Sequence, residues 1–218
     1  MPSLILSLLI AVFAFGVGAG RLFKKGTPMY WQLYICAAGC FALRQLSETV
    51  NFLCGLQGNI SAGMLGIFGC NFFLLSANYG TLDKVVDDGG AENKPARRLA
   101  LLAPAVMAAL VTLVFFVWSK KDIVCGVLWL LVLLPVLPAS YFNMKHLLLP
   151  LDDFELLRAT RPSNLVSLGF YLLSALYGLL CALGNTALAG VTSVLLSASM
   201  LFLVRAAIRG AKIWKTCY

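Results

Sequence analysis

Three polar side chains recur along one otherwise apolar segment, and their types and spacing are suited to chemistry inside a membrane. Arg44, Glu48 and Asn51 stand at positions i, i+4 and i+7, which places them on one side of an α-helix. A charged side chain in a bilayer is unfavourable by roughly 2.5–3.5 kcal/mol, so it persists where it pairs, faces a bundle interior or contacts water. Two interpretations follow for Arg44 and Glu48. The first is a ligand site, proton relay or gate; the second is an ion pair that only fixes helix packing, or a Glu48 that already lies in the outer headgroup region.

Further polar residues lie inside other apolar segments, where they can reach the same interior. Asn71 is near the middle of the segment 60–82, Tyr171 lies in 163–183 and Ser197 in 187–207. We therefore predict a ligand site between the helices 29–53, 60–82, 163–183 and 187–207. Its candidate residues are Arg44, Glu48, Asn51, Asn71, Tyr171 and Ser197, and none is assigned a catalytic role.

The composition requires a membrane around the elements that position these residues. Of the 218 residues, 61% are hydrophobic and 12% are charged, whereas soluble domains have roughly 25% charged residues. A spanning helix needs roughly 20 mostly apolar residues. The predicted fold is an all-α integral membrane protein, with residues 1–218 forming one transmembrane domain. Seven segments meet the length requirement: 3–20, 29–53, 60–82, 99–119, 123–146, 163–183 and 187–207.

The basic residues predict how this seven-helix bundle is oriented. Fourteen of the 17 Lys and Arg residues flank the predicted helices on one side, while the other side has Lys120 and Lys121. Lys and Arg accumulate on the cytoplasmic side of a membrane protein, so we expect the N-terminus outside, the C-terminus in the cytoplasm and the cell membrane as the location. Residues 3–20 are expected to be a retained helix, because the nearest basic residues follow the apolar run instead of preceding it.

Prolines, glycines and the absence of polar residues predict how some of the segments bend and pack. Pro135 and Pro138 interrupt the segment 123–146, which predicts either a hinge or the ordinary presence of proline in a membrane bundle. Gly66 and Gly69 belong to a ridge of small residues that favours close helix packing. The segments 3–20 and 99–119 are nearly free of polar side chains, so we expect them to face lipid.

Several classes of function are disfavoured by what the sequence lacks. There is no C-x-x-C pair, and His146 is the one histidine, so we expect no metal site and no cofactor. The motifs H-E-x-x-H and G-x-S-x-G are also absent, which argues against an enzyme. The basic residues flank apolar segments, so nucleic acid is not an expected partner. A disulfide between two of Cys54, Cys125 and Cys181 is left open, and the sequon Asn59–Ser61 is discounted because its loop is short.

The expected topology is similar to that of the SWEET sugar transporters, although the proline–glutamine signature of related PQ-loop proteins is missing. It also resembles the seven-helix sensor regions that precede some bacterial histidine kinases. The leading hypothesis is a small-solute transporter or permease, and the alternative is a membrane sensor or interaction subunit that signals through its cytoplasmic loops. The candidate partners are the lipid bilayer, a small-molecule ligand, a homo-oligomer and a separate signalling protein.

Overall fold

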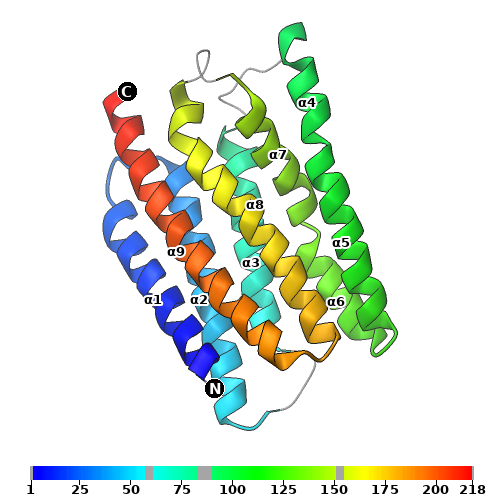
Figure 1. Ribbon diagram of the computed structural model, residues 1–218. Coiled ribbons are helices and arrows are strands. Elements are labelled where there is room, and N and C mark those ends of the chain that lie inside the picture. The colour runs from blue at the N-terminus through cyan, green and yellow to red at the C-terminus, as the bar shows by residue number, and fades with distance from the viewer. Residues whose placement is uncertain (1, 57–60, 83–89, 151–154, 218) are drawn as a thin grey trace.

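The computed structural model describes residues 2–56, 61–82, 90–150 and 155–217, and all regular structure in these ranges is helical (Figure 1). The α-helices are α1 (Pro2–Leu22), α2 (Met29–Leu53), α3 (Gly63–Leu75), α4 (Lys94–Ala100), α5 (Leu102–Ser119), α6 (Ile123–Leu133), α7 (Val136–Leu148), α8 (Glu155–Ala182) and α9 (Thr186–Cys217). A π-helix, η1 (Ser76–Leu82), continues α3, and a short 3₁₀-helix, η2 (Ala91–Asn93), precedes α4.

The helices pack side by side in one bundle, and the two termini lie at its opposite ends (Figure 1). Helix α9 lies between α1 and α8, while α5 packs against α6, α7 and α8. We name the two ends of the bundle by their residues. The basic end carries Arg21 at the end of α1 and Arg209 near the end of α9, and the turn end carries the α8–α9 turn at Gly184.

Five helical stretches of the described chain are long and apolar enough to cross a membrane. They are Pro2–Leu22, Ala91–Ser119, Ile123–Leu148, Leu157–Ala182 and Thr186–Trp214. Large apolar side chains face outward from the bundle, including Leu9 (62% exposed), Leu65 (75%) and Phe116 (58%). Surface of this kind is stable in contact with lipid and unfavourable in water, so the architecture is that of a helical membrane protein.

Burial separates the helices at the edge of the bundle from those at its centre. Only 22% of the most apolar window is buried in α1 and in the stretch Ala91–Ser119, against 39–50% in the other three stretches. This confirms the prediction that the segments 3–20 and 99–119 are peripheral. The stretch Ile123–Leu148 has the largest buried share, 50%. The sequence prediction placed four other helices around the ligand site and did not include this one.

The helix between Ile123 and Leu148 is interrupted, as its prolines predict. Helix α6 ends at Leu133, and α7 begins at Val136 after Pro135. The amide of Leu137 bonds the carbonyl of Leu134 (3.2 Å), which is the tighter three-residue spacing instead of the α-helical one. Hinge motion at this point stays a prediction.

Two predicted helix ends are wrong for one physical reason. Helix α8 begins at Glu155 and not at 163, running through Pro162, and α9 continues to Cys217 and not to 207. The prediction ended each helix where charged residues begin. Charge ends the part of a helix that lies in hydrocarbon, but the backbone remains helical in water until a residue breaks it. The predicted turn at Gly184 is confirmed, since its φ is +74°, in the region that glycine adopts without strain.

Candidate functional site

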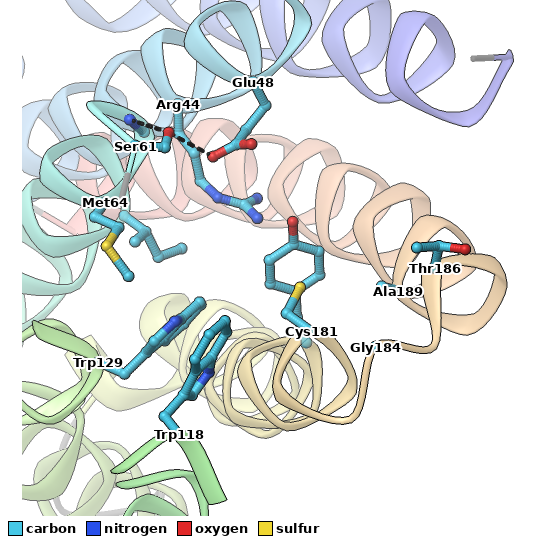
Figure 2. A pocket seen from close by; sticks show the side chains of 13 residues that line it. Arg44, Glu48, Ser61, Met64, Trp118, Trp129, Cys181, Gly184, Thr186 and Ala189 are labelled. Atoms are coloured by element: carbon cyan, nitrogen blue, oxygen red, sulfur yellow. Dashed lines mark hydrogen bonds between the residues drawn. The ribbon is translucent and has the colours of Figure 1, made fainter. Parts of the chain in front are cut away.

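The turn end of the bundle contains a cavity of about 260 Å³ (Figure 2). Its walls come from α2, α3, α5, α6, α8 and α9, together with Ser61 and Gly184 from the connections. The lining residues are Arg44, Glu48, Ser61, Gly63, Met64, Ile67, Trp118, Trp129, Tyr177, Cys181, Gly184, Thr186 and Ala189.

Arg44 is the buried cation of this cavity. The residue is 2% exposed, and its guanidinium carbon lies 4.4 Å from the centre of the Tyr177 ring and 5.5 Å from that of Phe41. Its Nη1 is buried and has no hydrogen-bond partner within the described part of the chain. The two aromatic faces offset part of the cost of burying the charge, while the Nη1 protons remain available to a ligand.

Glu48 is held by a different partner. Its Oε1 accepts a hydrogen bond from the Ser61 hydroxyl (2.8 Å), and that hydroxyl accepts one from the amide of Gly63 (2.9 Å). No hydrogen bond joins Arg44 to Glu48, although both side chains line the cavity (Figure 2). The packing hypothesis, in which the two form an ion pair, is therefore wrong in its simplest form.

Glycines bring α3 close enough to α2 to form this wall. A Cβ atom at Gly66 would lie 2.7 Å from the carbonyl oxygen of Cys40 and 2.8 Å from Cβ of Arg44, and one at Gly69 would lie 3.0 Å from Sγ of Cys40. A Cβ at Gly63 would lie 2.6 Å from Oε1 of Glu48. The predicted role of Gly66 and Gly69 in close packing is confirmed.

Two tryptophans complete the wall opposite Arg44. Trp118 is 7% exposed and donates from Nε1 to the carbonyl of Gly178 (3.0 Å), and Trp129 is 6% exposed. A Cβ at Gly178 would lie 2.9 Å from the Trp129 ring, so both indoles pack on the backbone of α8. Sequence reasoning missed them, because tryptophan near a helix end is also typical of the membrane interface and its spacing does not show which way it faces.

The structure separates the six residues that the sequence grouped into one site. Arg44 and Glu48 meet in the cavity, whereas Asn51 is half-buried outside its lining. Asn71 is fully buried and donates from Nδ2 to the carbonyl of Val132 (3.0 Å) in α6, next to the proline interruption. Ser197 lies 3.5 Å from Nε2 of Gln45 between α9 and α2.

Tyr171 belongs to a second group of polar residues, nearer the basic end. Nδ2 of Asn143 lies 3.4 Å from the Tyr171 hydroxyl, and Oδ1 of Asn143 accepts a hydrogen bond from Nδ2 of Asn78 (3.1 Å). The hydroxyls of Tyr30 and Tyr34 are 2.8 Å apart. All five side chains are at most 2% exposed. We call these five residues the central network.

The π-helix η1 gives Asn78 its position in the central network. The segment 60–82 was predicted as one regular helix, but the structure changes from α-helix to π-helix at Ser76. A π-turn widens the helix and rotates the following side chains relative to the α-helical register, and such turns are frequent at functional sites. No periodicity in the sequence marks this change.

The three candidate cysteines are unpaired, and one of them, Cys181, lines the cavity. Cys54, Cys125 and Cys181 are free thiols in the structure, so no disulfide joins any two of these three cysteines. The sequon begins at Asn59, which lies outside the described residues. The cavity therefore presents one guanidinium, one carboxylate, the Cys181 thiol and an aromatic wall.

No protein-family model, curated protein or solved structure matches this chain.

Proposed function

We propose that the chain is a small-solute transporter with seven membrane spans, and that it takes up an organic solute with a carboxylate group at the Arg44 cavity. The observation that carries the proposal is the buried Nη1 of Arg44, which lines a cavity and has no partner among the described residues. A buried donor without a partner is unfavourable by about 1–3 kcal/mol, and more when it is charged. A carboxylate that enters the cavity supplies the missing acceptor.

The proposal of seven spans adds two helices, α2 and the continuous α3–η1, to the five apolar stretches, and both are long enough to cross a membrane. Helix α2 has 25 residues, which corresponds to about 37 Å at 1.5 Å per residue. Helices α3 and η1 follow one another without a break from Gly63 to Leu82. An odd number of crossings also leaves the termini at opposite ends of the bundle, as Figure 1 shows.

The distribution of charge supports an outer N-terminus. Residues 1–47 and 156–218 contain no Asp or Glu, so the basic end is free of carboxylates where α1 and α9 finish. A surface of this kind is expected on the cytoplasmic side of the cell membrane. The cavity at the turn end then opens toward the outside.

The polar interior below the cavity supports transport. Along α3 and η1, Asn71 and Asn78 follow the cavity residues Met64 and Ile67 in the direction of the basic end. Several fully buried polar atoms there have no partner within the described chain, including Oδ1 of Asn78 and both side-chain polar atoms of Asn164. Such atoms are rare in a packed interior, and they would contact water or solute in a conformation that opens this region. The α6–α7 interruption supplies a place for that opening.

Uptake by reconstituted vesicles tests this proposal. The purified chain is placed in liposomes that are preloaded with unlabelled solute, and the entry of radiolabelled organic acids and amino acids is measured. We expect exchange of at least one labelled solute, and its loss in Arg44→Gln. Absence of exchange for every solute, with a protein that is correctly inserted and folded, would overturn the transporter proposal.

One feature favours a sensor as the second candidate. Phe41 and Phe170 are both fully buried, and their rings pack edge to face with centres 5.6 Å apart between α2 and α8. Phe41 precedes Arg44 by about one turn of α2, toward the basic end. A sensor needs ligand access from one side only, so binding of a solute without any vesicle exchange would support this alternative.

A further inference from the structure

Two opposite charges line the cavity, and each is held by its own partner. Arg44 and Glu48 are one helical turn apart on α2, a spacing at which Cβ atoms are about 5–6 Å apart and an ion pair is easily formed. Here the guanidinium instead faces the ring of Tyr177, and the carboxylate accepts from Ser61. Both groups are therefore available to a ligand at the same time (Figure 2).

Two opposite charges that line the same cavity suit a ligand that carries both charges. A guanidinium binds a carboxylate through two parallel hydrogen bonds. An ionised carboxylate only accepts hydrogen bonds, whereas an ammonium group only donates them, so Glu48 suits an ammonium group. An α-amino acid presents its carboxylate and its ammonium on one carbon atom, and it therefore can contact both residues of α2 together.

The rest of the cavity indicates what the remainder of the ligand is like. Arg44 and Glu48 are the charged residues among the described lining, and the apolar side chains that line the cavity include Met64, Ile67 and the two tryptophans. The volume of about 260 Å³ lies below the roughly 300–1,000 Å³ of sites for drug-sized ligands. A small ligand with an apolar side chain fits this combination.

We propose that the Arg44 cavity binds an α-amino acid with an apolar side chain, the carboxylate on Arg44 and the ammonium on Glu48. The inference rests on the proposed function, because it assumes that the cavity is where the solute binds. It goes beyond that function by naming the substrate class and by giving Glu48 a role in selecting it.

Binding to the full chain in detergent tests the substrate class. The probes are alanine, valine, leucine, methionine and phenylalanine, each beside the carboxylic acid that lacks the amine and the amine that lacks the carboxylate. Affinity is obtained from the rise in unfolding temperature with probe concentration. We expect at least one amino acid to bind about tenfold or more tightly than both of its analogues, because each analogue leaves one charged group unpaired.

Glu48→Gln provides the sharper arm of the test. Glutamine keeps an acceptor for Ser61 but removes the charge, so the preference for the amino acid over its deaminated acid should fall to about twofold or less. Glu48→Asp keeps the charge and should keep the preference. Glu92→Gln is the control, since Glu92 is exposed on η2 away from the cavity, and it should change nothing.

The outcomes separate this inference from the proposed function. Equal binding of the amino acids and their deaminated acids to the unmodified chain would overturn the inference and leave an anion transporter. A preference that survives in Glu48→Gln would remove Glu48 from recognition and also overturn it. If no amino acid binds while vesicles exchange another organic acid, only the inference fails; if vesicles exchange nothing, the transporter proposal fails.

Discussion

The guanidinium carbon of Arg44 on α2 lies 4.4 Å from the centre of the Tyr177 ring on α8. With the Phe41–Phe170 contact, this pair connects two helices that face each other across the bundle interior. Long side chains, and not close backbones, fill the space between them. Arg44 and Tyr177, which bridge α2 and α8, both line the cavity. Trp118 of α5 and Trp129 of α6 line it as well.

The Tyr177 ring should stabilise the buried charge of Arg44. We expect Tyr177→Leu to be about 0.5–2 kcal/mol less stable than Tyr177→Phe, because phenylalanine keeps an aromatic face for the cation. The measurement is thermal or denaturant unfolding of the purified chain in detergent. In an Arg44→Leu background the cation is absent, so the difference in stability between Tyr177→Leu and Tyr177→Phe should be smaller. What remains of it then reflects only the different volumes of the two side chains. An equal difference in both backgrounds would show that the ring does not interact with the charge.

Gly66 should be required for the approach of α3 to α2. Gly66→Ala places a methyl group 2.7 Å from the carbonyl of Cys40, so the helices must separate, and we expect a loss of about 1–3 kcal/mol. Gly16→Ala is the matched control, because Gly16 also lies within a helix but a Cβ there meets nothing within 4 Å. That control should unfold at the same temperature as the unmodified chain or slightly above it. Equal effects of the two changes would contradict the close packing of α2 and α3.

The membrane class and much of the helix pattern could be predicted from the sequence, because apolar length and loop charge depend on composition alone. The interruption at Pro135 and the turn at Gly184 were also predictable, since each follows from one residue's backbone chemistry. The start of α8 and the end of α9 were not, because charged residues such as Arg158 and Arg209 also form part of these helices.

The candidate site was predictable only in part. Periodicity places Arg44 and Glu48 on one face of α2, but it does not show which helix that face meets. Asn71, Tyr171 and Ser197 each lie near the middle of their predicted segments. In the structure, however, each contacts a different helix. Trp118 and Trp129 enter the site through the packing of α5 and α6 against α8, which no local pattern records.

Asn78 and Asn143 should be energetically coupled. Asn143→Leu leaves Nδ2 of Asn78 without its side-chain acceptor in the bundle interior, so we expect a loss of about 1–3 kcal/mol. The double change Asn78→Leu with Asn143→Leu should be less destabilising than the sum of the single changes, because it removes both partners of the Asn78–Asn143 hydrogen bond together. Unfolding of the four proteins measures the coupling. Strictly additive losses would mean that the 3.1 Å contact contributes nothing to stability.

Asp122 should give the N-terminus of α6 a dependence on pH. Its side chain accepts hydrogen bonds from the Cys125 thiol (3.2 Å) and from the amides of Val124 (2.9 Å) and Cys125 (3.3 Å). The Cys125 thiol and these amides hold the pKa of the Asp122 carboxyl below its ordinary value. A carboxyl with a depressed folded-state pKa contributes stability above its unfolded pKa of about 3.9, and that contribution is lost as the pH falls through the folded value.

Asp122→Asn isolates this effect, because asparagine also caps a helix but does not titrate in this range. Between about pH 5 and pH 3, on either side of the unfolded pKa, the unfolding temperature of the unmodified chain should fall more than that of Asp122→Asn. The other carboxyl groups are common to both proteins and cancel in the comparison. Parallel curves would show that the cap does not depend on the charge of Asp122.

The proposed orientation makes opposite predictions for two cysteines at opposite ends of the bundle. Cys54 is exposed where α2 finishes at the turn end, and α9 finishes at Cys217 at the basic end. With the basic end in the cytoplasm, a membrane-impermeant maleimide added to intact cells should label a chain that retains only Cys54. A chain that retains only Cys217 should react only after the membrane is permeabilised.

The two proteins serve as controls for each other, since both are exposed to the same reagent in the same cells. Labelling of Cys217 alone in intact cells would reverse the orientation and turn the Arg44 cavity toward the cytoplasm. Labelling of both would require an even number of crossings between residues 54 and 217, and hence a total other than seven.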